Sequence, residues 1–250
     1  MTNQYQFVPA TPGQLVEIGF KIAGTVTRIL SESGKISFKT GNHLILSPEH
    51  EVEKITKNFC KDFFGIVIDP WAEEKRRIEV FYKKFFDLII DWSLISVPIK
   101  GIMNRLDVAF GTITEDQYFE AYAKKFGKDN VWKYYNSITN AIHEQQIRPA
   151  GNYAYCHIGG DEPDFLNKSY DDGINENIKF MVPKEGIVSA FRYRTEANKM
   201  YDVKGITLFA ALDSDGYAMS MYRDYYGQFF VGYDDRDHCY PDNGLRKVDF

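Results

Sequence analysis

The chain has 250 residues, of which 44% are hydrophobic, 26% charged and 16% aromatic, and its formal net charge is −5 at pH 7. These values are typical of a globular domain and exclude collagen-like, coiled-coil and intrinsically disordered classes. Three cysteines without a Cys-x-x-Cys spacing predict free thiols rather than a disulfide framework. The N-terminus contains no basic stretch followed by an apolar run, so we expect a cytoplasmic protein, with leaderless export left open.

The N-terminal part of the sequence predicts a small antiparallel meander. Residues 25–30 and 35–40 alternate apolar and polar side chains, which is the pattern of a half-buried strand. Gly41-Asn42 precedes a third short run at 43–46, and a glycine in such a pair supplies the positive φ of a tight hairpin turn.

Helical periodicity begins at residue 47. Ser47-Pro48 and Asp69-Pro70 each place a capping side chain before a proline at the first helical position, so each pair predicts a helix start. The second of these helices is the clearest element of the sequence, because an apolar stripe at helical spacing continues from Trp71 to Trp92.

Two further helices are expected before residue 147. Thr114 and Gln117 have the spacing of a capping box, which predicts a helix that ends near Gly127. Asp129 predicts the start of the last helix, whose apolar face comprises Val131, Trp132, Tyr135, Ile138 and Ile142.

Arg148-Pro149-Ala150-Gly151 interrupts the helical pattern, and we place a boundary between two regions there. Residues 1–151 are expected to contain the meander and the helices, and residues 152–250 an antiparallel sheet. The expected strands of the sheet are residues 153–158, 178–182, 187–194, 203–212, 217–223 and 228–233. The predicted fold class is therefore α+β, with an N-terminal β-meander, a central helical region and a C-terminal antiparallel sheet.

The predicted C-terminal sheet has two unlike faces, because successive side chains of a strand point to opposite sides. One face is apolar and forms a core. The other face combines guanidinium groups with aromatic rings and small polar groups, and its candidate binding residues are Arg192, Arg194, Tyr222, Gln228 and Phe230. Such side chains are enriched where proteins bind partners, which predicts a recognition surface. The structural alternative is a loop or helix that covers this face, with the arginines at its edge.

Charge is distributed unevenly along the chain. Residues 1–151 have a net charge of +1, whereas residues 152–250 have a net charge of −6. The acidic region repels phosphate backbones, which disfavours nucleic-acid binding by the C-terminal part. The longest apolar stretch, residues 85–99, is interrupted by charged residues and is too short to span a bilayer. The expected partner is therefore a protein with a basic surface, without nucleic acid or membrane.

Acidic residues gather in the C-terminal loops, most densely after the last predicted strand. Converging carboxylates there would suit Mg²⁺ or Ca²⁺, and the candidate ligands are Asp234, Asp235, Asp237 and His238. Aspartates also stabilise tight turns, so the same pattern is typical of loops that hold no metal. No other cofactor is indicated, since neither a phosphate-binding glycine loop nor a zinc-ligand spacing occurs.

A metal-dependent phosphodiester hydrolase of the nuclease type is the alternative function. Asp164 follows one predicted strand, and Asp202 and Lys204 open another, so that two carboxylates and a lysine can be placed around a metal-bound water. The Asp/Glu-x-Lys pattern, however, occurs about as often as the composition alone predicts. Because no complete catalytic signature is present, we expect a noncatalytic binding or inhibitory module that uses the Arg/aromatic face and the acidic loops.

Overall fold

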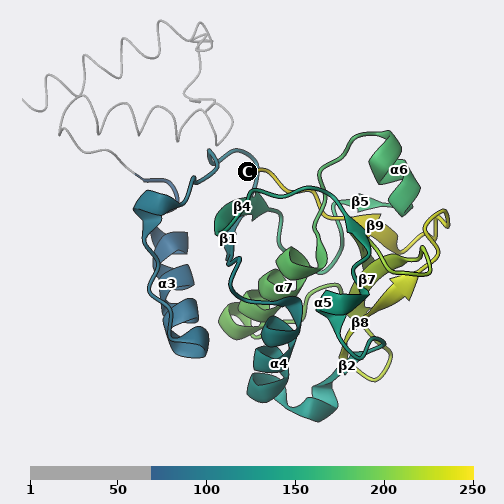
Figure 1. The fold of residues 1–250 in the computed structure, drawn as a ribbon, viewed down its shortest axis with the longest axis horizontal. Coiled ribbons are helices and arrows are strands. Elements are labelled where there is room, and N and C mark those ends of the chain that lie inside the picture. The colour runs from purple at the N-terminus through teal and green to yellow at the C-terminus, as the bar shows by residue number, and fades with distance from the viewer. Residues whose placement is uncertain (1–68) are drawn as a thin grey trace, which may run out of the picture. The chain divides into compact units, whose positions relative to one another are not determined.

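The computed structural model describes residues 69–250, and Figure 1 shows their arrangement. The meander predicted at 25–46 and the helix predicted after Ser47 lie outside the described residues. The helices are α3 (Ala72–Phe86), α4 (Glu115–Phe126), α5 (Ile138–Ala141), α6 (Tyr170–Asn175) and α7 (Pro183–Ala197), with short 3-10 turns at Trp92–Leu94 and Lys128–Asn130. The strands are β1 (Arg105–Ala109), β2 (Val131–Lys133), β3 (Glu144–Gln145), β4 (Tyr153–His157), β5 (Phe165–Leu166), β6 (Ile206–Leu212), β7 (Ala218–Arg223), β8 (Phe229–Asp234) and β9 (Asn243–Leu245).

The strands form two sheets. β1 and β4 pair antiparallel, and the larger sheet has the order β2-β8-β7-β6-β9-β5, with β3 paired to β6. β6, β7 and β8 are the antiparallel meander predicted near the C-terminus, whereas β2 joins β8 and β9 joins β6 in parallel. The predicted fold class, α+β with a C-terminal antiparallel sheet, is confirmed. Several of these pairings join strands from opposite sides of residue 151.

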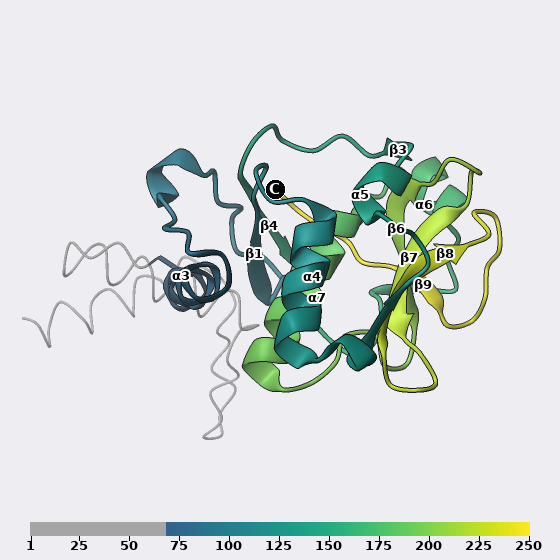
Figure 2. The ribbon, with the colours of Figure 1, turned by 60° about the horizontal axis from the view of Figure 1, so that its bottom comes forward.

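The elements stack in layers, which Figure 2 shows side by side. α3 packs on β1, α7 lies between the β1–β4 pair and the large sheet, and α4 lies against α7. Apolar side chains from all of these layers form the main core, among them Ile78, Leu106, Phe191, Met219 and Val231. A smaller apolar cluster covers the opposite face of the large sheet around β6, where Leu208 and Ala210 pack with Tyr170 of α6.

Helix α4 begins and ends at local signals, and α3 ends at one, although α3 begins at Ala72, after the predicted start at Asp69-Pro70. Thr114 accepts a hydrogen bond from the backbone N–H of Gln117, the Gln117 side chain accepts one from the N–H of Thr114, and Gly127 follows the last turn. The stripe that continues to Trp92 is helical only to Phe86, because Asp87 adopts the left-handed conformation, with φ of 53°, and closes the last turn of α3. No helix within residues 69–250 is both long and apolar enough to cross a bilayer.

The strand predicted at 187–194 is wrong, because these residues belong to α7. Pro183 occupies the first turn of this helix, and the carboxylate of Glu185 accepts the backbone N–H of Val182 as a capping group. The alternation of apolar and polar residues from Ile187 onward fits one side of a helix as well as it fits a strand. The neighbouring strand predicted at 178–182 is reduced to a single bridge between Phe180 and Lys247.

The helix predicted at 131–142 is also wrong. Its first residues form β2, which extends the large sheet beyond β8, and its later residues form the short helix α5. Ser137 caps α5 by accepting the backbone N–H of Asn140. The aromatic residues between 131 and 135 therefore lie along an edge strand, where they are available to pack against side chains of β8.

Candidate functional site

The two arginines assigned to the outward sheet face lie on α7 instead, so this part of the predicted surface is wrong. Arg192 is buried and donates to the Leu106 carbonyl and to the carboxylates of Asp107 and Glu196. Burial opposes ionisation of Asp107, but the charge of Arg192 holds the pKa of that carboxyl below its usual range. Arg194 is partly exposed and donates to the hydroxyl of Tyr122 at 2.9 Å. Both arginines thus stabilise helix packing.

The other three predicted binding residues lie at the β7–β8 hairpin. Tyr222 of β7 is directly opposite Phe230 of β8, and Trp132 of β2 is opposite Phe230 on its other side. The ring centroids are 4.6 Å apart in both pairs, with interplanar angles of 33° for Tyr222 and 17° for Trp132. We call Trp132, Phe230 and Tyr222 the aromatic row. It crosses three adjacent strands.

The aromatic row is accessible to solvent. Trp132 is 43% exposed, and Phe230 and Tyr222 are half-buried. The apolar cluster around β6 packs under α6 on the same side of the sheet, but it includes no member of the row. Three neighbouring, solvent-accessible rings that contact one another mark this end of the sheet as a candidate binding surface.

Two tyrosines extend the surface at the tip of the hairpin. Tyr225 is 98% exposed and Tyr226 is 85% exposed. The turn that presents them is closed by Asp224, whose carboxylate accepts the N–H of Gln228 at 2.7 Å, and by Gly227, whose φ is 83°. The side chain of Gln228 in turn donates to the carbonyl of Asp129, which connects the hairpin to the turn before β2.

Gly232 allows the Phe230 ring to lie flat along its own strand. A Cβ atom at position 232 would lie 2.2 Å from Cε1 of Phe230, which is far inside van der Waals contact. A side chain at this position would therefore push the central ring of the aromatic row out of place. The row depends on a small residue two positions further along β8.

Carboxylates lie beside the aromatic row. Burial raises the pKa of Tyr222, and the negative charges of Asp224 and Asp234 raise it further. These two aspartates lie near opposite ends of the hairpin's strands, and the acidic loop that follows β8 continues beyond Asp234. The surface thus combines exposed rings with the predicted acidic loop, but without Arg192 and Arg194, which lie on α7.

The four predicted metal ligands are spread over that loop and have other partners. Asp234 accepts from the amide of Asn243 at 2.9 Å, and Asp235 pairs with His238 at 2.8 Å, while the Asp237 side chain is exposed. Among residues 69–250, no group of three or more His, Cys, Asp or Glu side chains is arranged to hold a metal ion. The geometry therefore adds no support to the predicted Mg²⁺ or Ca²⁺ site.

The three predicted catalytic residues are only partly brought together. Asp202 is 1% exposed and forms an ion pair with the buried Arg246, and Asp164 accepts the backbone N–H of the next residue, Lys247, at 3.0 Å. Burial raises the pKa of both carboxyls. Lys204 is exposed, and its nearest carboxylate is that of Glu162 at 3.9 Å. The lysine thus faces solvent while Asp202 faces the interior.

A buried Ser, His and Asp set was not foreseen from the sequence. Ser189 of α7 donates to Asp107 at 2.8 Å, and Nε2 of His157 lies 2.7 Å from the same carboxylate oxygen. In a nucleophilic triad, the acid and the nucleophile contact different nitrogens of the histidine. Here Nδ1 faces the Tyr201 hydroxyl instead, and Asp107, His157 and Ser189 have no exposed surface. This cluster is a structural network between β1, β4 and α7.

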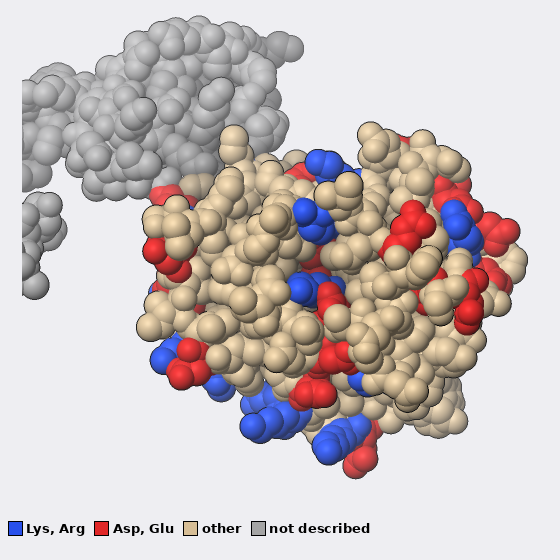
Figure 3. All heavy atoms as spheres, in the orientation of Figure 1, with Lys and Arg blue, Asp and Glu red and all other residues tan. Residues whose placement is uncertain are grey.

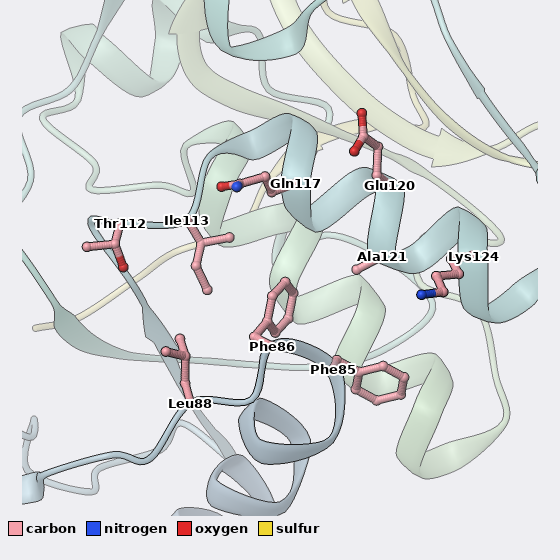
Figure 4. Close-up of a pocket in the computed structure, with 9 residues that line it drawn as sticks. All are labelled: Phe85, Phe86, Leu88, Thr112, Ile113, Gln117, Glu120, Ala121 and Lys124. Carbon is pink, nitrogen blue, oxygen red and sulfur yellow. The ribbon is translucent and has the colours of Figure 1, made fainter.

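A groove of about 430 Å³ lies between the end of α3 and α4, and Figure 4 shows the side chains around it. Phe86, Leu88 and Ile113 face one another across its floor, while Glu120 and Lys124 project from α4 at its rim. Its floor is apolar, and it has no buried ionisable group among the residues that line it. The groove therefore offers an apolar contact surface but no buried ionisable group for catalysis or for specific polar binding.

Sequence reasoning missed Trp132, Tyr225 and Tyr226. Trp132 was assigned to a helix, and its place in the surface depends on β2 joining a strand much later in the chain. The hairpin tyrosines could have been found, because Asp224-Tyr225-Tyr226-Gly227 separates two predicted strands with a four-residue loop. No protein-family model, curated protein or solved structure matches this chain.

Proposed function

We propose that this protein is a noncatalytic recognition module, which binds a basic protein segment through the aromatic row and the tyrosines of the β7–β8 hairpin. The observation that carries the proposal is the stacked, solvent-accessible row of Trp132, Phe230 and Tyr222. Three strands fix the positions of the three rings, so that little conformational entropy is lost when a partner packs against them.

The residue types support protein binding. Tyrosine and tryptophan supply large, rigid contact areas with polar atoms at their edges, and they dominate the energetics of protein interfaces. Exposed rings at a hairpin tip, such as Tyr225 and Tyr226, contribute nothing to the core and are available for contact. The half-buried Phe230 at the centre and the more exposed residues around it resemble the usual order of an interface, with an apolar centre and a wetter rim.

The charges select a cationic partner. Asp224 and Asp234 lie close enough to the Tyr222 hydroxyl to raise its pKa, and residues 152–250 have a net charge of −6. An arginine of the partner can stack on an aromatic face and pair with a carboxylate at the same time. The same charge disfavours single-stranded nucleic acid, which would otherwise be a candidate for stacked rings.

Phosphodiester hydrolysis remains the second candidate, but the geometry favours it less. A residue that positions a metal-bound water has to reach solvent or substrate, whereas Asp202 is buried and its charge is compensated by Arg246. The exposed Lys204 does not approach either aspartate through a direct ion pair; it lies nearest to Glu162.

The proposal can be tested by selecting binders to the unmodified chain from a library of random displayed peptides. Selected peptides are expected to be enriched in arginine or lysine, and to lose at least tenfold in affinity for the Trp132→Ala variant. Tyr217→Ser is the matched control, because Tyr217 is also partly exposed but immediately precedes β7, at the end of that strand away from Tyr222. Peptides without basic enrichment, or binding that survives Trp132→Ala and fails in Tyr217→Ser, would contradict the proposed surface.

A further inference from the structure

A second hollow lies beneath the segment 145–151, away from the aromatic row. Its volume is about 410 Å³, which is within the usual range for small-ligand sites. The side chains that matter for its chemistry are those of Glu115, Arg148, Pro149, Tyr153, Val182 and Lys184. In Figure 3, basic and acidic atoms meet in a recess near the middle of the face that is shown.

The overlying segment is held in place by two glycines. The N–H of Gly111 donates to the Asn152 side chain at 3.1 Å, and a Cβ atom at position 111 would lie 2.9 Å from the carbonyl oxygen of Gly151. Gly151 itself has a φ of 76°, which side chains rarely tolerate. This close approach fixes one end of the segment over the cavity.

Arg148 and Glu185 form a completed ion pair in the cavity wall. The guanidinium donates to both carboxylate oxygens, at 2.6 and 3.0 Å, and the Tyr153 hydroxyl donates to the same carboxylate at 2.9 Å. Glu185 is fully buried and also accepts the backbone N–H of Val182. Arg148 and Glu185 therefore have their hydrogen-bond partners within the protein. They fix the geometry of the cavity wall and are not the groups that would bind a ligand.

Lys184 differs from Arg148 because its partners are distant. Only 18% of its side chain is exposed, yet its nearest acceptors are the Phe110 carbonyl at 3.4 Å and the Glu115 carboxylate at 3.8 Å. Charge-assisted hydrogen bonds are normally 2.7–2.9 Å long, and an ammonium group has three donors. The amino group therefore has capacity for another acceptor, and Lys184 is one of the residues that line the cavity.

We propose that this cavity binds a small organic carboxylate, whose oxygens accept hydrogen bonds from Lys184 and whose apolar body packs against Pro149 and Val182. A singly charged anion fits better than a phosphate dianion, because the carboxylates of Glu115 and Glu185 already face the two cations of the site. This inference does not depend on the proposed function.

Benzoate is a suitable probe, with its neutral analogue benzamide for comparison, and ligand-observed NMR with the full chain detects weak binding. Benzoate is expected to bind and benzamide to bind at least tenfold more weakly. Lys184→Met, which removes the charge but keeps most of the side-chain stem, is expected to weaken benzoate binding about tenfold or more, as for loss of a charged hydrogen bond. Lys124→Met in the groove of Figure 4 is the matched control and should leave binding unchanged.

A second variant changes affinity in the opposite direction. Glu115→Gln removes the negative charge that lies 3.8 Å from the lysine but keeps an oxygen that can accept from Thr139, so benzoate should bind more tightly. This expected gain in benzoate affinity tests the site even if the Lys184→Met variant does not fold normally. Equal binding of benzoate and benzamide, benzoate binding that survives Lys184→Met, or no benzoate signal with the unmodified chain would each overturn the inference.

Discussion

The indole of Trp132 stacks on the phenyl ring of Phe230, with centroids 4.6 Å apart and planes inclined by 17°. The two residues are neighbours only because β2, which follows α4, joins β8 in parallel at the edge of the large sheet. Through Phe230 the stack continues to Tyr222, so one contact between distant parts of the chain creates a surface that three strands hold.

Replacing Trp132 should affect binding more than stability. Since the side chain is 43% exposed, Trp132→Ala is expected to lower the free energy of unfolding by about 1 kcal/mol, the scale of one aromatic pair. Phe229→Ala, at a buried position of the neighbouring strand β8, should cost about 3–5 kcal/mol. Urea denaturation followed by circular dichroism measures both values. Equal costs would mean that Trp132 is a structural residue.

Gly232→Ala should disturb the aromatic row without unfolding the sheet. The new methyl group would occupy the position of the Phe230 ring, which can rotate away at small cost but then no longer stacks on Trp132. We expect stronger quenching of tryptophan fluorescence by acrylamide, together with weaker peptide binding. Gly101→Ala, where an added Cβ meets nothing within 4 Å, is the control that should leave both measurements unchanged.

The Asp202→Ala variant tests whether Asp202 stabilises the protein interior. Its removal would leave the guanidinium of Arg246 buried without its carboxylate partner, which should lower the free energy of unfolding by about 3–5 kcal/mol. The double variant Asp202→Ala with Arg246→Met should recover part of that loss. A stable Asp202→Ala protein that loses a phosphodiesterase activity would instead support the hydrolase alternative.

Acid should loosen the connection between α4, α5 and β2 through Asp116. Burial opposes its ionisation, but Lys133, Ser137 and the first N–H groups of α5 hold the pKa of Asp116 below its usual value. A lowered folded-state pKa stabilises the protein above the unfolded pKa of about 4, and this stabilisation is lost as pH falls below it. Asp116→Asn should therefore flatten the loss of stability on acidification, measured by thermal unfolding between neutral pH and pH 3. An unchanged pH profile would contradict this role.

Local signals predicted some elements well. The capping box of Thr114 and Gln117 depends on a few neighbouring residues, and so does the short loop between the strands predicted at 203–212 and 217–223. Helix α4 and the hairpin of β6 and β7 therefore follow from the sequence. The 187–194 segment failed because its apolar spacing satisfies a helix and a strand equally, and only the packing of α7 between two sheets decides between them.

The candidate surface could be predicted only in part. Tyr222 and Phe230 lie on consecutive strands and Gln228 on the loop that joins them, so alternation placed these residues correctly near one another. Arg192 was misplaced along with its helix, and Trp132 could not be found, because parallel pairing of β2 with β8 joins segments that no local pattern connects. The same non-local packing brings Lys184 to Glu115, so the cavity had no sequence signal either.

Reversing the charges of the acidic loop after β8 should slow the association of a basic partner. Asp234→Lys, Asp235→Lys and Asp237→Lys together would replace three negative charges by three positive ones beside the aromatic row. Because long-range attraction acts mainly on the encounter, the association rate should fall and its dependence on salt should flatten, while dissociation changes less. Stopped-flow measurements with a selected basic peptide at several salt concentrations separate these rates. Glu120→Lys, on the exposed side of α4, is the control for a change of net charge away from the row. Association rates and salt dependence that match the unmodified chain would remove the acidic loop from the binding surface and leave the rings alone to account for it.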